Sequence, residues 1–165
     1  MQGNPEIIAL LNGLLAGELM ARDQYFIHAR MYENWGYRKL HERIWHEMED
    51  ETGHADWLIR RILFLEGTPQ VVPSPAPKVG KDVPEMLRND LAVEYAVVAE
   101  LKQAIARCEA LGDYVTREML ERMLDDTEED HAHWLEKQLG LIERVGLANY
   151  LQVQLSEGSG GGASS

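Results

Sequence analysis

Glu51-Thr52-Gly53-His54 is a motif that the chain repeats as Glu128-Glu129-Asp130-His131, and this repeat points to the architecture of the whole chain. Each Glu-x-x-His motif is preceded, about one helical hairpin earlier, by another glutamate, Glu18 in the first half and Glu94 in the second. Glu94 follows Glu18 by 76 residues, and the second motif follows the first by 77 residues. In four-helix bundles, four carboxylates and two histidines in this arrangement hold two metal ions in the core.

The sequence around these residues predicts an all-α fold of four long helices. Asn4 is a good N-cap before Pro5 at the first helical position, and Gly36 can take the left-handed conformation that ends a helix. Asp82 and Glu85 are spaced as a capping box. The expected helical segments are Asn4–Gly36, Arg38–Leu65, Asp82–Gly112 and Asp113–Val145, with a short fifth helix over Leu147–Leu155.

Two domain boundaries and one connection follow from the segments between these helices. Residues 1–155 are expected to form one domain, and the Gly/Ser-rich residues 156–165 a flexible tail, either native or an added linker. The first and second helices, and the third and fourth, are joined by tight turns and are therefore antiparallel. The proline-rich segment from Glu66 to Asp82 is long enough to cross the whole bundle, which predicts the ferritin-like connection with one long crossover.

The six motif residues all fall within the apolar stripes of their helices, at one level of the expected bundle. A single glutamate on a helix usually belongs to a solvated face, and a Glu-His pair of this spacing is usually a surface pair. Six such placements at one depth do not fit that interpretation, because buried unpaired carboxylates are costly. Two divalent cations would balance four carboxylates. Carboxylate-rich ligation suits iron or manganese, although zinc also binds such sites.

Composition narrows the function classes. The formal net charge of −12 argues against nucleic acid and anionic membranes as partners. The single cysteine, Cys108, excludes an intrachain disulfide and a four-cysteine zinc or rubredoxin-type site, and it is expected to be an inert packed thiol. The start of the chain lacks a basic leader, and no apolar run could span a bilayer, which predicts a cytoplasmic protein.

The motifs and their surroundings resemble bacterioferritin along nearly the whole chain, up to Glu157. Shared-looking stretches are 24–31 (QYFIHARM), 62–67 (ILFLEG), 85–88 (EMLR) and 146–151 (GLANYL). The resemblance implies a hollow shell of 24 subunits, in which Fe(II) is oxidised by oxygen or hydrogen peroxide and stored as a ferric mineral. It leaves open whether a ferredoxin supplies the electrons for iron release.

The resemblance also assigns roles to the motif residues. Glu18 and Glu94 look like terminal ligands, each to one iron, whereas Glu51 and Glu128 look like bridging carboxylates. His54 and His131 would each ligate one iron.

Further residues near these positions have both a functional and an ordinary interpretation. His46 and Asp50 match an inner-surface iron site of the family, but they would equally suit an ordinary polar helix face. Glu47 could relay iron from the surface. Tyr25 and Trp134 could donate electrons, although aromatic packing is the simpler role.

The chain departs from bacterioferritins at the haem position. Those proteins usually bind haem between two subunits through one methionine from each, and the matching residue here is Thr52. A hydroxyl is a poor substitute for a thioether on haem iron, while Met31 and Met48 are expected to be packing or interface residues. We therefore expect no normal haem b in a homo-oligomer. The chain would form a haemless shell, or it would be the ferroxidase subunit of a mixed shell whose other subunit binds haem.

Two other functions remain open at this stage. One is a di-iron or di-manganese oxidase or peroxidase, since rubrerythrins share the core motif, although this chain lacks the cysteine pairs of their electron-transfer module. The other is a purely structural shell subunit, such as an engineered cage carrying the Gly/Ser tail. The complete ligand set argues against an inactive shell.

Overall fold

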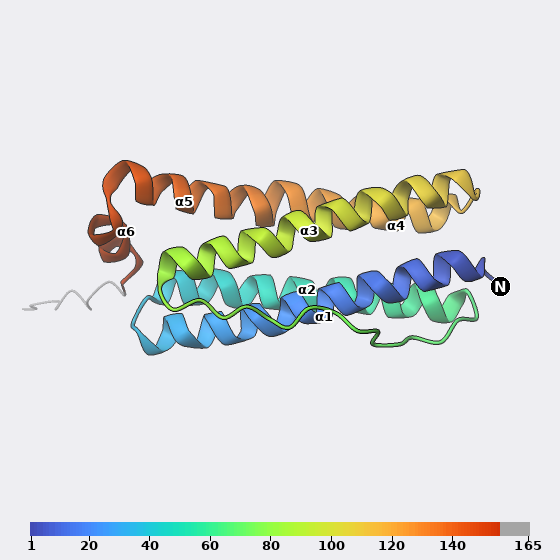
Figure 1. Ribbon diagram of the computed structural model, residues 1–165, viewed down its shortest axis with the longest axis horizontal. Coiled ribbons are helices and arrows are strands. Elements are labelled where there is room, and N and C mark those ends of the chain that lie inside the picture. The colour runs from blue at the N-terminus through green and yellow to red at the C-terminus, as the bar shows by residue number, and fades with distance from the viewer. Residues whose placement is uncertain (156–165) are drawn as a thin grey trace, which may run out of the picture.

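Two helical hairpins lie side by side in the computed structural model, which describes residues 1–155 (Figure 1). The first hairpin pairs α1 (Pro5–Asn34) with α2 (Arg38–Phe64). The second pairs α3 (Val83–Ala110) with a long helix built from α4 (Tyr114–Asp125), the π-helical turn η1 (Asp126–Ala132) and α5 (His133–Val145). The short α6 (Leu147–Gln154) packs across one end of the bundle. The predicted tail, 156–165, lies outside the described residues.

The helices begin and end where the capping residues predicted. Asn4 Oδ1 accepts a hydrogen bond from the Glu6 backbone N–H at 2.8 Å, and Asp82 Oδ1 accepts one from the Glu85 N–H at 2.9 Å. Gly36 and Gly112 follow α1 and α3 with φ values of 82° and 73°, a left-handed conformation that residues with a Cβ rarely adopt. Each hairpin turn is therefore fixed by a glycine.

The crossover, residues 65–82, runs the length of the bundle, so that α2 and α3 point the same way (Figure 1). Three buried polar side chains of α1 hold it. Asn12 binds the backbone of Thr68 and Gln70, Gln24 Oε1 accepts from the Lys78 N–H at 2.9 Å, and His28 Nε2 accepts from the Gly80 N–H at 3.1 Å. These contacts satisfy backbone groups in a segment that has no secondary structure of its own.

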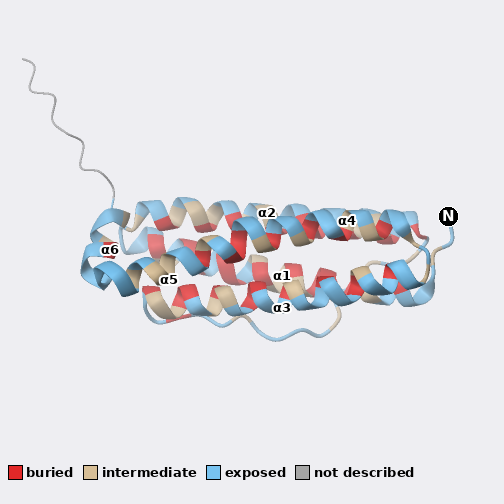
Figure 2. Ribbon diagram, turned by 90° about the horizontal axis from the view of Figure 1, so that it is seen from above, coloured by how far each residue is buried: buried red, intermediate tan, exposed pale blue. Residues whose placement is uncertain are grey.

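The core follows the apolar stripes and lies between the hairpins, as the buried positions in Figure 2 show. The residues predicted for the apolar stripes of the first two helices are all buried: Ile7, Leu11, Leu14, Ala21, Tyr25 and Tyr32 in the first, and Leu40, Ile44, Leu58, Ile62 and Leu65 in the second. In α3 the buried face is shifted slightly: Val93 and Val97 are buried, whereas Leu91 and Val98 are half-buried at the side of the bundle. No helix within residues 1–155 is both long and apolar enough to cross a membrane.

The fourth helix differs from the prediction of one uninterrupted α-helix from Asp113 to Val145. The structure has a π-helical turn at Asp126–Ala132, in the middle of that segment. A π turn takes up one more residue than an α turn, so an insertion can be absorbed without rotating the rest of the helix. His131 within the turn and Leu135 beyond it consequently stay on the buried face.

Candidate metal centre

Two groups of three ligating side chains meet in the middle of the bundle and share one residue. Glu18, Glu51 and His54 form the first group, and Glu51, Glu94 and His131 form the second. In each group, one potential ligand atom from every residue lies within 4.8 Å of the others, and all five residues are buried. Glu51 belongs to both groups, as a carboxylate does when it bridges two ions.

The distances between the ligand atoms leave room for a cation in each group. His54 Nδ1 lies 3.8 Å from Glu18 Oε2 and 3.7 Å from Glu51 Oε2. His131 Nδ1 lies 3.0 Å from Glu51 Oε1 and 3.7 Å from Glu94 Oε1. Two ligands that are each ~2.1 Å from one ion, at an angle of ~90–120°, are themselves roughly 3.0–3.6 Å apart. The observed distances of 3.0–3.8 Å lie at or slightly beyond this range, which leaves space for one ion in each group.

Several of these buried atoms lack hydrogen-bond partners within the described part of the chain. They are both carboxylate oxygens of Glu18, Glu94 Oε2, and Nδ1 of His54 and of His131. Buried polar atoms in native proteins are nearly always satisfied, and a bound ion is one of the usual reasons for an exception. Five of the eleven such atoms in the described residues belong to the two groups, and this concentration supports metal ligation there; others, such as Tyr32 Oη and Asp90 Oδ2, belong to neither group.

The electrostatics of the site point the same way. Burial raises the pKa of Glu18 well above its usual value, and the neighbouring charge of Glu51 raises it further. Burial also raises the pKa of Glu94, and His131 only partly offsets this effect. Burial would lower the pKa of His54, but the nearby carboxylates of Glu18 and Glu51 favour its charged form, outweigh burial and raise that pKa to about 11. The site thus favours proton binding at Glu18, Glu94 and His54, and a metal ion would compete with these protons.

Glu128 is the one predicted ligand that the structure does not bring into the cluster. Its side chain is 40% exposed and forms an ion pair with Lys102, at 2.5 Å between Glu128 Oε1 and Lys102 Nζ. The predicted convergence of six residues is thus observed for five. The physical reason is the π turn, since it places Thr127 on the buried face of the helix and turns Glu128 outward.

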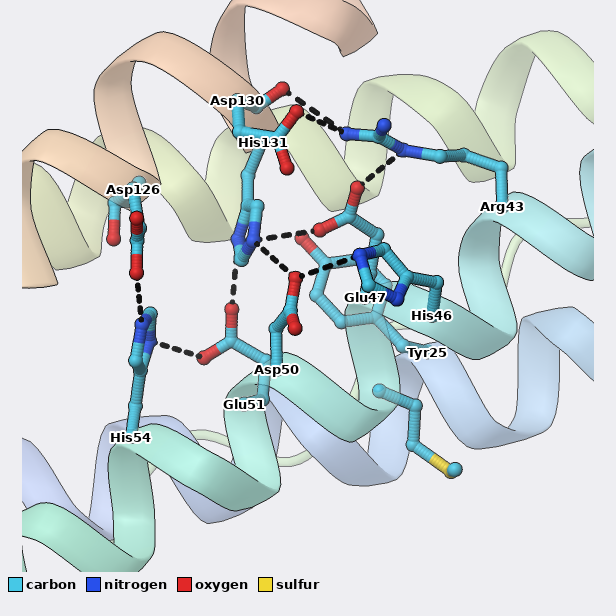
Figure 3. Close-up of polar contacts among 12 residues, drawn as sticks. Tyr25, Arg43, His46, Glu47, Asp50, Glu51, His54, Asp126, Asp130 and His131 are labelled. Carbon is cyan, nitrogen blue, oxygen red and sulfur yellow. Dashed lines mark hydrogen bonds and ion pairs between the residues drawn. The ribbon is translucent and has the colours of Figure 1, made fainter.

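Carboxylates outside the two groups contact the opposite nitrogen of each histidine (Figure 3). His54 Nε2 lies 3.2 Å from Asp126 Oδ2. His131 Nε2 lies 2.8 Å from Glu47 Oε2 and 3.3 Å from Asp50 Oδ2. Such outer partners orient a ligating imidazole and fix which nitrogen faces the metal. Asp126 was not among the residues predicted from the sequence, although it follows Asp50 at the same offset that relates Glu94 to Glu18.

His46 and Asp50 lie together on α2, where His46 is exposed and Asp50 is half-buried. His46 Nε2 is 3.3 Å from Asp50 Oδ2, the same oxygen that contacts His131. The Asp50 pKa is lowered, chiefly by its hydrogen bond to His131. Asp50 therefore connects the exposed His46 to the buried cluster, as Figure 3 shows.

A third acidic group, formed by Glu47, Asp50, Asp130 and His131, already contains a cation of the protein. Arg43 Nε lies 2.5 Å from Glu47 Oε1, and Arg43 Nη2 lies 2.9 Å from Asp130 Oδ1. The guanidinium balances these carboxylates, so the third group does not require a metal ion.

Tyr25 and Trp134, the two aromatic candidates, and Thr52, at the haem position, each contact a neighbouring group of the protein. Tyr25 is fully buried and its hydroxyl donates a hydrogen bond to Glu94 Oε1. Trp134 packs against the guanidinium of Arg43, 5.0 Å from the ring centre. Thr52 is exposed on α2, and its hydroxyl donates to the Met48 carbonyl at 2.9 Å.

Comparison with known proteins places this geometry in a family. The model of the ferritin-like domain matches residues 8–145. The chain is 61% identical over 156 residues to the bacterial ferritin of Synechocystis sp., covering 94% of this chain and all of that protein. It is 61% identical over 155 residues to the bacterial ferritin of Pseudomonas aeruginosa, with the same coverage. Identity to the bacterioferritin of Mycobacterium leprae is 41% over 146 residues, covering 88% of this chain and 91% of that protein. The chain belongs to the ferritin-like family.

Proposed function

We propose that this protein is an iron-storage ferroxidase of the bacterioferritin type, which oxidises Fe(II) at the cluster around Glu51 and stores the product as a ferric mineral inside a shell of 24 subunits. The observation that carries the proposal is the pair of three-residue groups that share Glu51, because it offers two adjacent cation positions joined by one carboxylate. The relatives named bacterial ferritin support iron as the substrate.

The proposed reaction needs two Fe(II) ions held at once. Glu18 and His54 would bind one ion, Glu94 and His131 the other, and Glu51 would lie between them. Each Fe(II) gives up one electron, and one oxygen molecule takes both electrons with two protons to form hydrogen peroxide. Hydrogen peroxide can itself take two electrons and two protons to give water. Holding both ions together permits this two-electron step and avoids one-electron products.

Asp50 and His46 suggest where the iron enters or leaves the cluster. Asp50 contacts both the buried His131 and the exposed His46, so these two residues form a short polar connection between the cluster and one face of α2. In the proposed shell this face would line the inner cavity, and oxidised iron would pass along it to the mineral.

We further propose that a homo-oligomer of this chain binds no bis-methionine haem. Thr52 offers only a hydroxyl at the family's haem position, and that hydroxyl is already bonded to its own helix. Incubation of the purified shell with haemin should give no low-spin Soret spectrum, whereas Thr52→Met should produce one. A spectrum of that kind in the unmodified protein would contradict this part of the proposal.

The experiment that tests the main proposal adds Fe(II) in air to metal-free protein and follows the ferric absorbance against the iron added per chain. A fast phase that saturates near two irons per chain, followed by slow mineral growth, is expected. Absence of a fast phase would contradict ferroxidase activity.

Particle size separates the cage from a small di-iron oxidase or peroxidase. One chain has a mass of 18.8 kDa, and a shell would have 24 times that mass, which light scattering resolves easily from a monomer or dimer. A small particle with a working cluster would favour the oxidase or peroxidase function instead.

A further inference from the structure

Arg43 places a positive charge of the protein next to the metal centre. It belongs to α2, one turn before Glu47, and its side chain is only 25% exposed. The guanidinium has two acidic partners: Nε lies 2.5 Å from Glu47 Oε1, and Nη2 lies 2.9 Å from Asp130 Oδ1 (Figure 3). Both partners adjoin His131, the first in space and the second in the chain. Arg43 can therefore act on the surroundings of this imidazole in two ways.

The first connection runs through a side chain. Glu47 is buried, and its two oxygens have different neighbours: Oε1 faces Arg43, whereas Oε2 lies 2.8 Å from His131 Nε2. A carboxylate beside the outer nitrogen of a ligating imidazole fixes the orientation of the ring, and such carboxylates are themselves held by further partners. A buried carboxylate also needs a positive partner, and arginine supplies a permanent charge.

The second connection runs through the backbone. Arg43 Nη2 donates a hydrogen bond to the Asp130 carbonyl oxygen at 3.2 Å, in addition to the bond with its carboxylate, and Asp130 directly precedes His131 in the π turn. These bonds join residues 87 positions apart, so that they tie the π turn of the second hairpin to α2 of the first. The same guanidinium thus holds the backbone that carries His131 and the side chain that contacts its outer nitrogen.

Packing limits the positions that this guanidinium can take. Its central carbon lies 5.0 Å from the ring centre of Trp134, at the start of α5. Arginine stacks on aromatic faces, and its N–H groups form a rigid fork that can hold two acidic groups in a fixed relation. A lysine would keep the charge but would act as a single point charge on a flexible stem. The shape of the guanidinium therefore matters here as well as its charge.

We propose that Arg43 is a positioning residue for His131, which holds Glu47 and Asp130 in place and so directs Nδ1 of the imidazole into the second ligand group. The inference rests on the proposed function, because it needs a cation in that group. It predicts that loss of the guanidinium weakens binding of the ion beside His131 much more than binding of the ion beside His54.

The test measures Co(II) binding to the full-length protein by visible absorption and calorimetry, after treatment with a chelator, without oxygen and at one pH. Arg43→Met keeps much of the apolar stem. It should weaken binding of one ion by about tenfold and leave the other within about twofold. Loss of a positive charge alone would tighten cation binding, so a weakening reports position and not charge. Arg38→Met, at an exposed arginine of α2 that pairs with Glu42, is the matched control and should weaken neither ion.

Two further variants separate the fork from the charge and identify the affected ion. Arg43→Lys should recover only part of the affinity, because it keeps the charge without the fork. In a His131→Gln background, Arg43→Met should have no further effect on the ion that remains, because its influence passes through that imidazole. Circular dichroism checks that each variant folds, and Arg43→Lys tests the inference even where Arg43→Met does not fold.

The outcomes distinguish this inference from the proposed function. If wild-type protein binds two Co(II) ions per chain and Arg43→Met binds both as tightly or more tightly, the inference fails while the two-ion site stands. Equal weakening of both ions, or full recovery of affinity in Arg43→Lys, would also overturn it, since general destabilisation or charge alone would then explain the effect. If wild-type protein does not bind two ions, the proposed site itself is wrong and the inference falls with it.

Discussion

The two hairpins of this bundle carry the same polar pattern and use it differently. In the first, α2 is a continuous helix, and Glu51 reaches both ligand groups. In the second, a π turn interrupts the corresponding helix, and Glu128 pairs with Lys102 at the surface. One inserted residue would rotate everything beyond it by about 100° if the helix stayed regular. The comparison shows that a π turn can absorb the inserted residue and keep His131 on the buried face. The residue that takes the other buried position of the turn is then Thr127 and not Glu128.

The largest loss of metal affinity is expected at Glu51, the motif glutamate that reaches both ligand groups. Glu51→Gln removes the only carboxylate that belongs to both groups, so both ions should bind more than about 100-fold more weakly, beyond the range of outer-partner changes. Co(II) titration with and without the substitution measures this effect, with Glu143→Gln on the exposed part of α5 as the control. Retention of one tightly bound ion would show that Glu51 does not bridge the two positions.

The outer partners of the two histidines should also differ. His54 Nε2 has one carboxylate partner, Asp126, whereas His131 Nε2 has both Asp50 and Glu47. Asp126→Asn should therefore lower metal affinity by ~10–100-fold, and Asp50→Asn by clearly less, since Glu47 still orients His131. Calorimetric titration compares the two variants, with Asp125→Asn as the control. Equal losses would mean that Glu47 does not support His131.

The α1 and α3 helices offer a comparison away from the metal site. His28 of α1 is buried, accepts from the Gly80 N–H and contacts Asp90 at 2.8 Å, whereas the equivalent residue of α3 in the internal repeat is Ala104. His28→Ala leaves two buried polar groups without this partner, at a cost of about 1–3 kcal/mol each. Hydrogen exchange at Gly80 should become at least about tenfold faster. The exposed Gln103→Ala should leave it unchanged, and an unaltered rate in His28→Ala would show that the crossover is held elsewhere.

The smallest effect is expected at Cys108, which is the equivalent in α3 of the buried Tyr32 in α1. Burial raises the pKa of the Cys108 thiol to about 11. At pH 8 only roughly 0.1% of this thiol is ionised, and the thiolate is the reactive form. Reaction with a disulfide reagent should be very slow in the folded protein and rapid in denaturant. The stability linked to this group falls as the pH rises from its ordinary pKa towards 11. Rapid labelling of the folded protein would contradict the packing around Cys108.

Most of the bundle could be predicted from local features. Asn4, Gly36, Asp82 and Gly112 set the helix ends through capping and positive φ, which depend on residue type at one position. The length and proline content of the crossover determined its course. The common level of the five clustered ligands followed from counting residues back to the turns, because antiparallel helices have the same rise per residue.

The parts that could not be predicted depend on how the helix absorbs an extra residue and on side-chain choices in three dimensions. The longer offset of the second motif signals an insertion but does not say which of Thr127 and Glu128 turns inward. The pairing of Lys102 with Glu128, and of Arg43 with two carboxylates, involves long side chains with many rotamers. Asp126 could have been found by applying to Asp50 the offset that relates Glu94 to Glu18.

A crystal structure of the protein loaded with Co(II), with anomalous data collected at the cobalt edge, would show directly whether the site holds two ions. Two peaks per chain are expected, one among Glu18, Glu51 and His54 and the other among Glu51, Glu94 and His131. A single peak in the bundle, or peaks only beside the exposed His46, would contradict a site in which Glu51 joins two ions.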